Sequence, residues 1–198
     1  MKTFLTLGDS YTIGEGVLLK DSFPYQIVQL LRQQNIEVAA PEIIAKTGWT
    51  TKNLLDGISS TKLLPNYDFV SLLIGVNNQY DGVAFEDFEN EFEVLIQKSI
   101  ELANNNSNHV FVLSIPDWGA TPFAADRDRV SITAEIKKYN HYCKLVAKKY
   151  NCVFIEITEV YILDAAKEDF LASDKLHPSG KEYGKWAEGL SDLLFKSV

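Results

Sequence analysis

The sequence predicts an α/β protein in which helices cover a five-stranded parallel sheet. Segments with strand-like and helix-like patterns alternate along the chain. Such an order gives a parallel sheet, because each right-handed crossover places a helix between two successive strands. Several strand-like segments are nearly continuous in apolar residues, which indicates burial on both faces of the sheet. Hydrophobic residues make up 46% of the chain and charged residues 23%, which is sufficient for a globular core.

Short apolar or β-branched runs predict the strands, at residues 3–7, 42–45, 69–74, 110–115 and 153–157. After the first and second strands, helices are expected to begin near Pro24 and Thr51. After the third and fourth strands, residues 85–100 and 130–146 carry apolar side chains at three- and four-residue spacing, which is typical of amphipathic helices. The last helix is expected from about residue 179 to residue 195, with Trp186 in the core.

The length of 198 residues predicts one domain over residues 1–198, because domains usually hold about 100–200 residues. No repeat, linker or low-complexity segment divides the chain. Lys and Arg number 19 and Asp and Glu 27, so the net charge is −8. A field of that sign repels polyphosphates, which disfavours nucleic acids and anionic membranes as partners.

Membrane insertion is not expected. The first apolar stretch reaches Gly8 after a few residues, which is too short for the core of a signal peptide. No apolar run approaches the roughly 20 residues that span a bilayer. The chain as given is therefore expected to be cytoplasmic, although a processed secreted form would look the same, and its oligomeric state is open.

The two cysteines, Cys143 and Cys152, are expected to be buried thiols, since no C-x-x-C motif or cluster of cysteines and histidines accompanies them. His109 and His141 are interpreted as structural or solvated residues. We expect neither a metal site nor a cofactor.

Polar residues and glycines follow the predicted strands at the edge where ligands bind in such sheets, outside the carboxyl ends of the strands. Ser10 follows the first strand, Gly48 the second and Asn77 the third. Beyond the fifth strand, Asp174 precedes His177 by three residues. This edge therefore brings together a hydroxyl, an imidazole, a carboxylate and donors of hydrogen bonds.

A serine hydroxyl is a weak nucleophile, and ester chemistry needs a base, an acid that orients the base and donors for the oxyanion. These residue types supply all four. Each also has a structural interpretation: Ser10 as part of a helix cap, Asp174 and His177 as loop residues, and Gly48 and Asn77 as turn residues. Their joint occurrence at successive strand ends favours the chemical interpretation.

The whole set resembles the blocks of the GDSL or SGNH hydrolase family. The matching segments are Gly-Asp-Ser-Tyr at 8–11, Gly48, Gly-Val-Asn at 75–77 and Asp-Lys-Leu-His at 174–177, in the family's order and over nearly the whole chain. The resemblance implies a flavodoxin-like three-layer α/β/α sandwich. It also implies Ser10 as nucleophile, His177 as base and Asp174 as its orienting acid. The oxyanion hole would consist of the N–H groups of Ser10 and Gly48 and the side chain of Asn77.

Two positions depart from the family pattern. Tyr11 stands where the family name has leucine, and Asn78 stands where the pattern has aspartate. The second change leaves open how the Asn77 loop is braced. A G-x-S-x-G elbow is absent from the sequence, which argues against the larger α/β-hydrolase fold.

The resemblance implies a serine esterase or acylhydrolase that acts on a small-molecule ester. The lack of a long cap insertion favours short or carbohydrate-linked acyl groups. Aromatic residues in or near the edge loops are candidates to line the substrate site or to anchor loops: Trp49, Tyr80, Trp118 and Phe123. Two alternatives stay open. One is an acyltransferase or thioesterase with the same catalytic set, and the other is a non-catalytic module that binds a phosphate or a flavin.

Overall fold

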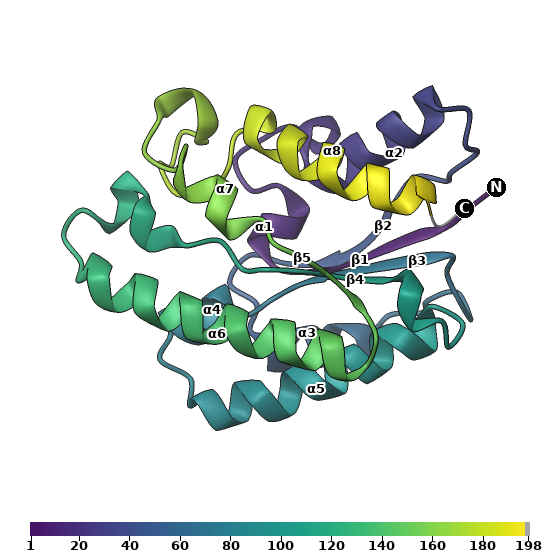
Figure 1. Ribbon diagram of the computed structural model, residues 1–198, viewed down its shortest axis with the longest axis horizontal. Helices are drawn as coiled ribbons and strands as arrows, with labels where there is room; N and C mark the ends of the chain where they lie inside the picture. The colour runs from purple at the N-terminus through teal and green to yellow at the C-terminus, as the bar shows by residue number, and fades with distance from the viewer. Residues whose placement is uncertain (197–198) are drawn as a thin grey trace.

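Five parallel strands form one sheet in the order β2-β1-β3-β4-β5 in the computed structural model, which describes residues 1–196 (Figure 1). The strands are β1 (Phe4–Gly8), β2 (Glu42–Ala45), β3 (Phe69–Leu73), β4 (Val110–Leu113) and β5 (Val153–Ile155). This is the strand order of flavodoxin-like doubly wound sheets. The predicted α/β class and the three-layer arrangement are confirmed.

Helices lie on both faces of the sheet. Figure 1 shows α2 and α8 on one side and α3, α5 and α6 on the other. The helices are α1 (Ser10–Ile13), α2 (Phe23–Gln33), α3 (Thr51–Ser60), α4 (Val76–Tyr80), α5 (Phe85–Leu102), α6 (Arg129–Lys149), α7 (Thr158–Ile162) and α8 (Gly180–Lys196). None of these described helices is both long enough and apolar enough to cross a membrane.

The periodic apolar residues of the helices face the sheet. In α2, Phe23, Ile27 and Leu31 recur every four residues and are fully buried. The helix packs against α8, where Trp186 is buried between Tyr161 and Tyr183, as expected for a core residue. Burial of such side chains supplies the main stabilisation of the layers, at about 25 cal/mol per Å² of apolar surface.

The three central strands are buried along their whole length, which explains their nearly continuous apolar sequences. Strand β1 pairs with both β2 and β3, so that Gly8 lies beside Ala45 and Leu73 at the carboxyl edge. The chain leaves β1 toward β2 and then returns to β3 on the other side. A crevice forms at such a reversal of strand order, between the first loops.

The strands β3, β4 and β5 end one or two residues before the predicted ends. Ile74, Ile115 and Ile157 are buried but lie beyond the paired segments. The Ser114 hydroxyl accepts hydrogen bonds from the N–H groups of Ile157 and Thr158, which turns the chain out of the sheet. Apolar sequence thus indicated burial at all three positions, and after β5 the backbone N–H groups bind a side chain instead of a neighbouring strand.

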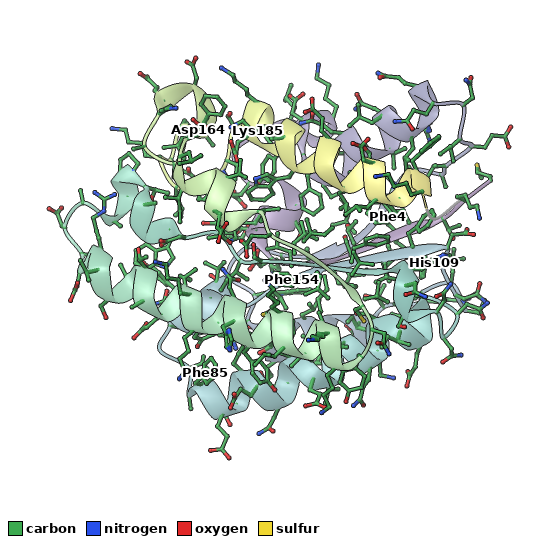
Figure 2. All side chains as sticks on the ribbon, viewed as in Figure 1. Phe4, Phe85, His109, Phe154, Asp164 and Lys185 are labelled. Atoms are coloured by element: carbon green, nitrogen blue, oxygen red, sulfur yellow. The ribbon has the colours of Figure 1, made fainter. Side chains whose placement is uncertain are left out.

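Side chains away from the carboxyl edge have structural surroundings (Figure 2). His109 packs on Phe69 at the opposite edge of the sheet, with ring centroids 5.3 Å apart. Cys143 and Cys152 are buried free thiols, as predicted, and burial raises the pKa of both, that of Cys152 to about 12. They are therefore protonated packing residues at neutral pH.

Candidate active site

Ser10 is held at the sharp turn from β1 into α1. Gly8 allows this turn, because a Cβ there would lie 2.0 Å from the Thr12 hydroxyl oxygen. The Asp9 carboxylate accepts a hydrogen bond from the Tyr11 N–H at 3.0 Å and caps the helix. Asp9 therefore caps α1, and Ser10 is the first residue of the helix. The Ser10 hydroxyl does not take part in the cap and can bind another side chain.

That partner is His177, which a hairpin brings to the carboxyl edge from the other end of the chain. Leu171 and Pro178 form the bridge of the hairpin, and Asp174 lies at its tip. One oxygen of Asp174 accepts the N–H groups of Leu176 and His177, at 2.9 and 3.0 Å. The short separation of Asp174 and His177 in sequence thus folds into a rigid turn.

Three side chains form a continuous hydrogen-bonded row. The Nε2 atom of His177 lies 2.9 Å from the Ser10 hydroxyl oxygen, and its Nδ1 atom lies 2.6 Å from the second oxygen of Asp174. Ser10 and His177 are buried, at 4% and 6% exposure, whereas Asp174 is partly exposed. The structure therefore brings together the three residues that the sequence singled out for nucleophile, base and orienting acid.

The charge of Asp174 fixes which nitrogen of His177 carries the proton. Partial burial acts to raise the pKa of the Asp174 carboxyl, but hydrogen bonds from the His177 ring and from two backbone N–H groups outweigh it and lower this pKa below its ordinary value. An ionised carboxylate can only accept hydrogen bonds, so Nδ1 is the protonated nitrogen. The lone pair of Nε2 then faces the Ser10 hydroxyl.

Gly48 and Asn77 line the same cavity as Ser10. Gly48 has a φ of +80°, which favours glycine, and no atom lies within 4 Å of the place that a Cβ would take. Within residues 1–196, no acceptor takes the N–H of Ser10 or of Gly48. The Asn77 amide donates to the Trp49 carbonyl at 2.9 Å and has a long contact of 3.5 Å to Asp9.

Asn78 holds α4, the short helix that also carries Asn77, against α3. Its side-chain oxygen accepts the Thr51 N–H at 3.0 Å, and its NH₂ group donates to the Thr51 hydroxyl at 2.7 Å. That hydroxyl in turn donates to Glu91 on α5 at 2.5 Å. A neutral amide at position 78 can therefore both accept and donate, which aspartate, the residue of the family pattern, could not do when ionised.

Asp9 is fully buried beside Ser10. Burial is the largest cause of its pKa shift and raises the pKa of this carboxyl to about 7, against the hydrogen bonds that lower it. The Tyr11 and Tyr183 hydroxyls, also buried, have no hydrogen-bond partner among the described residues. The carboxyl group next to Ser10 therefore exchanges its proton around neutral pH and is protonated below it.

A cavity of about 210 Å³, here named the serine pocket, opens at the row. Tyr80, Trp118 and Phe123 line it, with Tyr80 and Phe123 each in edge contact with the Trp118 ring. The other lining residues are Ser10, Tyr11, Thr47, Gly48, Val76, Asn77, Leu176 and His177. The Trp49 indole does not line this pocket, because it packs on Gly57 of α3.

Sequence reasoning missed several lining residues, namely Tyr11, Thr47, Val76 and Leu176. Each is a direct neighbour of a predicted residue, so adjacency was the only available signal. In the described part of the chain, no group of three or more His, Cys, Asp or Glu side chains is arranged to hold a metal ion.

Comparison with known proteins gives a family and a fold. The model of the GDSL-like lipase/acylhydrolase family matches residues 6–184. A search of the curated proteins found no match.

Three solved structures with the same fold cover almost the whole chain. A lipase/acylhydrolase from Enterococcus faecalis is 21% identical with a TM-score of 0.73, covering 100% of this chain and 95% of its own. An acetylxylan esterase from Geobacillus stearothermophilus is 18% identical with a TM-score of 0.72, covering 99% and 93%. The esterase EstA from Pseudoalteromonas sp. is 17% identical with a TM-score of 0.70, covering 99% and 98%.

Proposed function

The chain belongs to the GDSL-like lipase/acylhydrolase family and is a carboxylic-ester hydrolase, and we propose that it works through an acyl-enzyme formed on Ser10. The observation that carries this proposal is the row of hydrogen bonds from Ser10 through His177 to Asp174, with lengths of 2.9 and 2.6 Å. The separations lie within the reach expected of a nucleophile, its base and the group that orients the base.

The chemistry follows from these contacts. His177 Nε2 takes the proton of the Ser10 hydroxyl while its oxygen attacks the ester carbonyl carbon. Asp174 stays ionised and stabilises the imidazolium that forms. As the tetrahedral intermediate collapses, His177 gives the proton to the leaving alcohol, and a water molecule then repeats the sequence on the acyl-enzyme.

The oxyanion of each intermediate would be held by the N–H groups of Ser10 and Gly48 and by the Asn77 amide. The two backbone groups have no acceptor within the described residues. One N–H of Asn77 is bound to Trp49, and the other has only the 3.5 Å contact to Asp9. The raised pKa of Asp9 favours this arrangement, because a protonated carboxyl, unlike a carboxylate, does not repel the oxyanion.

The serine pocket suits a short acyl group. Its 210 Å³ is below the roughly 300–1,000 Å³ of common drug-sized ligand sites. Tyr80, Trp118 and Phe123 supply aromatic walls, of which Trp118 is buried and the other two are exposed. One of the proteins of the same fold is named an acetylxylan esterase. We therefore extend the proposal to short acyl groups, including those carried by carbohydrates.

A fluorophosphonate probe tests the nucleophile directly. The wild-type protein and the Ser10→Ala variant are treated with the probe, and the label is detected by intact-protein mass spectrometry. Turnover is assayed with p-nitrophenyl acetate. Stoichiometric labelling and turnover that both vanish in the variant are expected. A folded wild-type protein that takes up no label and shows no turnover would contradict the proposal and favour a binding module.

The acceptor of the acyl group is tested separately, because a transferase would share the acyl-enzyme. Products are analysed with an added alcohol or thiol at increasing concentration. Acid as the main product supports hydrolysis. Preferential formation of a new ester or thioester in dilute acceptor would instead identify a transferase.

A further inference from the structure

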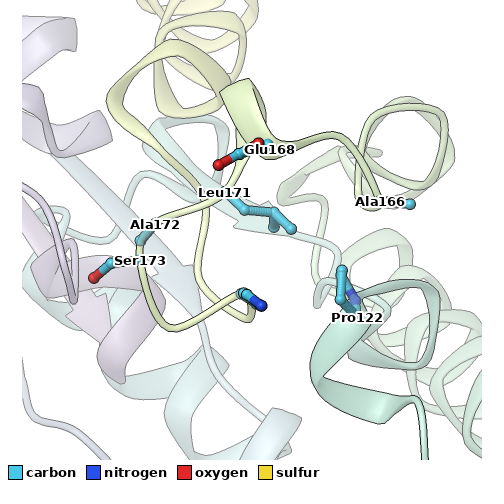
Figure 3. Close-up of a pocket in the computed structure, with 7 residues that line it drawn as sticks. Pro122, Ala166, Glu168, Leu171, Ala172 and Ser173 are labelled. Atoms are coloured by element: carbon cyan, nitrogen blue, oxygen red, sulfur yellow. The ribbon is translucent and has the colours of Figure 1, made fainter.

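A second cavity, here named the hairpin pocket, lies beside the hairpin that carries Asp174 and His177 and encloses about 440 Å³. Figure 3 shows Leu171 extending across it toward Pro122. The lining residues are Pro122, Ala166, Glu168, Leu171, Ala172, Ser173 and Lys175. None of them lines the serine pocket, so the family chemistry described above does not use this space.

The two pockets share a wall. The Phe123 N–H donates to the Lys175 carbonyl, joining the loop after β4 to the hairpin. Along the first segment, Pro122 lines the hairpin pocket and Phe123 the serine pocket. Along the second, Lys175 lines the hairpin pocket and Leu176 the serine pocket. A molecule that crosses this wall would therefore occupy both pockets.

The backbone of Lys175 is unusual for its residue type. Its φ of +59° lies in the left-handed region, which costs a residue other than glycine on the order of 1 kcal/mol. A hydrogen bond from the Lys175 N–H to the Ala172 carbonyl holds this turn. Lys175 lines one pocket and His177, two residues later, lines the other.

Two side chains of opposite charge on the hairpin pocket have no protein partner. Within residues 1–196, neither Lys175 nor Glu168 forms an ion pair or a side-chain hydrogen bond. Both are exposed. The apolar surfaces between them come from Pro122, Leu171 and Ala172. The pocket thus offers one donor group, one acceptor group and a small apolar face.

The position of His177 decides which half of an ester would reach this pocket. Its Nε2 atom has to give a proton to the leaving oxygen, so the alcohol half lies on the histidine side of the reacting bond. The wall that carries Lys175 and Leu176 continues directly into His177. The proposed oxyanion donors, by contrast, follow other strands: Gly48 lies in the loop after β2, and Asn77 lies in α4, after β3.

We propose that the hairpin pocket binds the alcohol half of the substrate, and that this half is a neutral polyhydroxylated ring such as a sugar. This inference rests on the proposed function. Hydroxyl groups would bond to Glu168 and Lys175, while the C–H face of the ring would pack on Leu171 and Pro122. An anionic alcohol fits less well, because Glu168 offsets Lys175 and the chain carries a net charge of −8.

Three acetates with different alcohols test the inference. Methyl acetate has a leaving group too small to reach the hairpin pocket, cyclohexyl acetate carries a ring without hydroxyls, and methyl 2-O-acetyl-β-xylopyranoside carries a ring with them. Each kcat/KM is divided by the value for methyl acetate. Two pocket variants are compared with the wild type. The first is the double variant Glu168→Gln/Lys175→Asn, in which asparagine tolerates the left-handed backbone at position 175. The second is Ala166→Trp, which fills the exposed side of the pocket. Glu188→Gln/Lys62→Asn, at exposed positions outside either pocket, is the matched control.

The double variant is expected to lower the kcat/KM ratio of the xylopyranoside acetate to methyl acetate about tenfold, because hydrogen bonds to charged groups are lost. The ratio of cyclohexyl acetate to methyl acetate should not change. Ala166→Trp is expected to lower both ratios. Unchanged ratios in both variants would overturn the inference, and so would equal losses for the two rings in the double variant. If wild-type protein hydrolyses neither methyl acetate nor p-nitrophenyl acetate, the proposed function fails and the inference with it. Turnover of these two esters with no effect of the pocket variants would refute the inference alone.

Discussion

The ring of Tyr11 lies against the imidazole of His177, with the two ring centroids 4.9 Å apart and the planes inclined by 53°. Tyr11 is 2% exposed and follows Ser10 directly in the sequence. The residue after the serine therefore restricts the rotation of the histidine that bonds to that serine. The Tyr11 ring, at the position where the family pattern has leucine, thus contacts the side chain that bonds to Ser10.

Replacing Tyr11 by leucine is expected to lower kcat about tenfold with little change in KM, because a geometric loosening of the base acts on the chemical step. The Tyr11→Phe variant retains the ring and is the matched control. It should keep wild-type kcat and should not lose stability, since the buried hydroxyl has no partner within residues 1–196. Steady-state kinetics and thermal unfolding of both variants check this. Equal kcat in the leucine variant and the wild type would contradict it.

Ser10→Ala should abolish nearly all ester turnover and leave the fold intact, because the hydroxyl bonds only to His177 among the described residues. Turnover of p-nitrophenyl acetate and the thermal unfolding midpoint are the measurements. Substantial turnover in a folded variant would disprove the role of Ser10.

Asn77→Ala removes one proposed donor for the oxyanion and should lower kcat by about 10²–10³-fold, with KM nearly unchanged. The variant also loses the hydrogen bond to the Trp49 carbonyl, so its thermal unfolding is measured alongside. An effect confined to KM would instead make Asn77 a substrate-binding residue.

Asn78→Asp, which restores the residue of the family pattern, should destabilise this chain by about 1–3 kcal/mol. The introduced carboxylate and Glu91 would compete for the single hydroxyl proton of Thr51, and their charges would repel each other. Adding Glu91→Gln supplies a donor for Thr51 and should recover most of the lost stability. Chemical denaturation of the single and double variants measures both effects. No rescue by the second change would refute the proposed competition.

The raised pKa of Asp9 predicts a component of stability that falls as pH rises. Burial raises this pKa from 3.8 to about 7, so between these values the folded chain holds a proton that the unfolded chain has lost. The free energy of unfolding therefore decreases through this range. Asp9→Asn removes the component, so its stability relative to wild type should rise from pH 4 to pH 8. Denaturant unfolding at several pH values measures the difference, and a constant difference would contradict the raised pKa.

The sequence predicted the parts of this molecule that depend on local pattern. The strands and long helices follow from apolar spacing, and the residues at the strand ends follow from topology, because parallel strands bring their carboxyl ends to one edge. Ser10, Asp174 and His177 were selected in this way and lie in hydrogen-bond contact.

Features that depend on distant partners were not predictable. The bracing of Asn78 needs Glu91 on another helix, and the orientation of Trp49 depends on the space left by Gly57. The short helices α4 and α7 span five residues each, which is too few for a periodic signal. The hairpin pocket is formed by segments about 50 residues apart in sequence, and no local pattern describes it.

The 167 residues that separate Ser10 from His177 make activity a reporter of complete folding. The proposed nucleophile lies at the first turn of the chain, and its proposed base lies in the hairpin before α8. A refolding intermediate in which this final segment has not docked would therefore contain the sheet but would not hydrolyse an ester. Long-range contacts of this kind form late, because they close large loops. Recovery of turnover after dilution from denaturant should therefore follow the slowest phase of refolding.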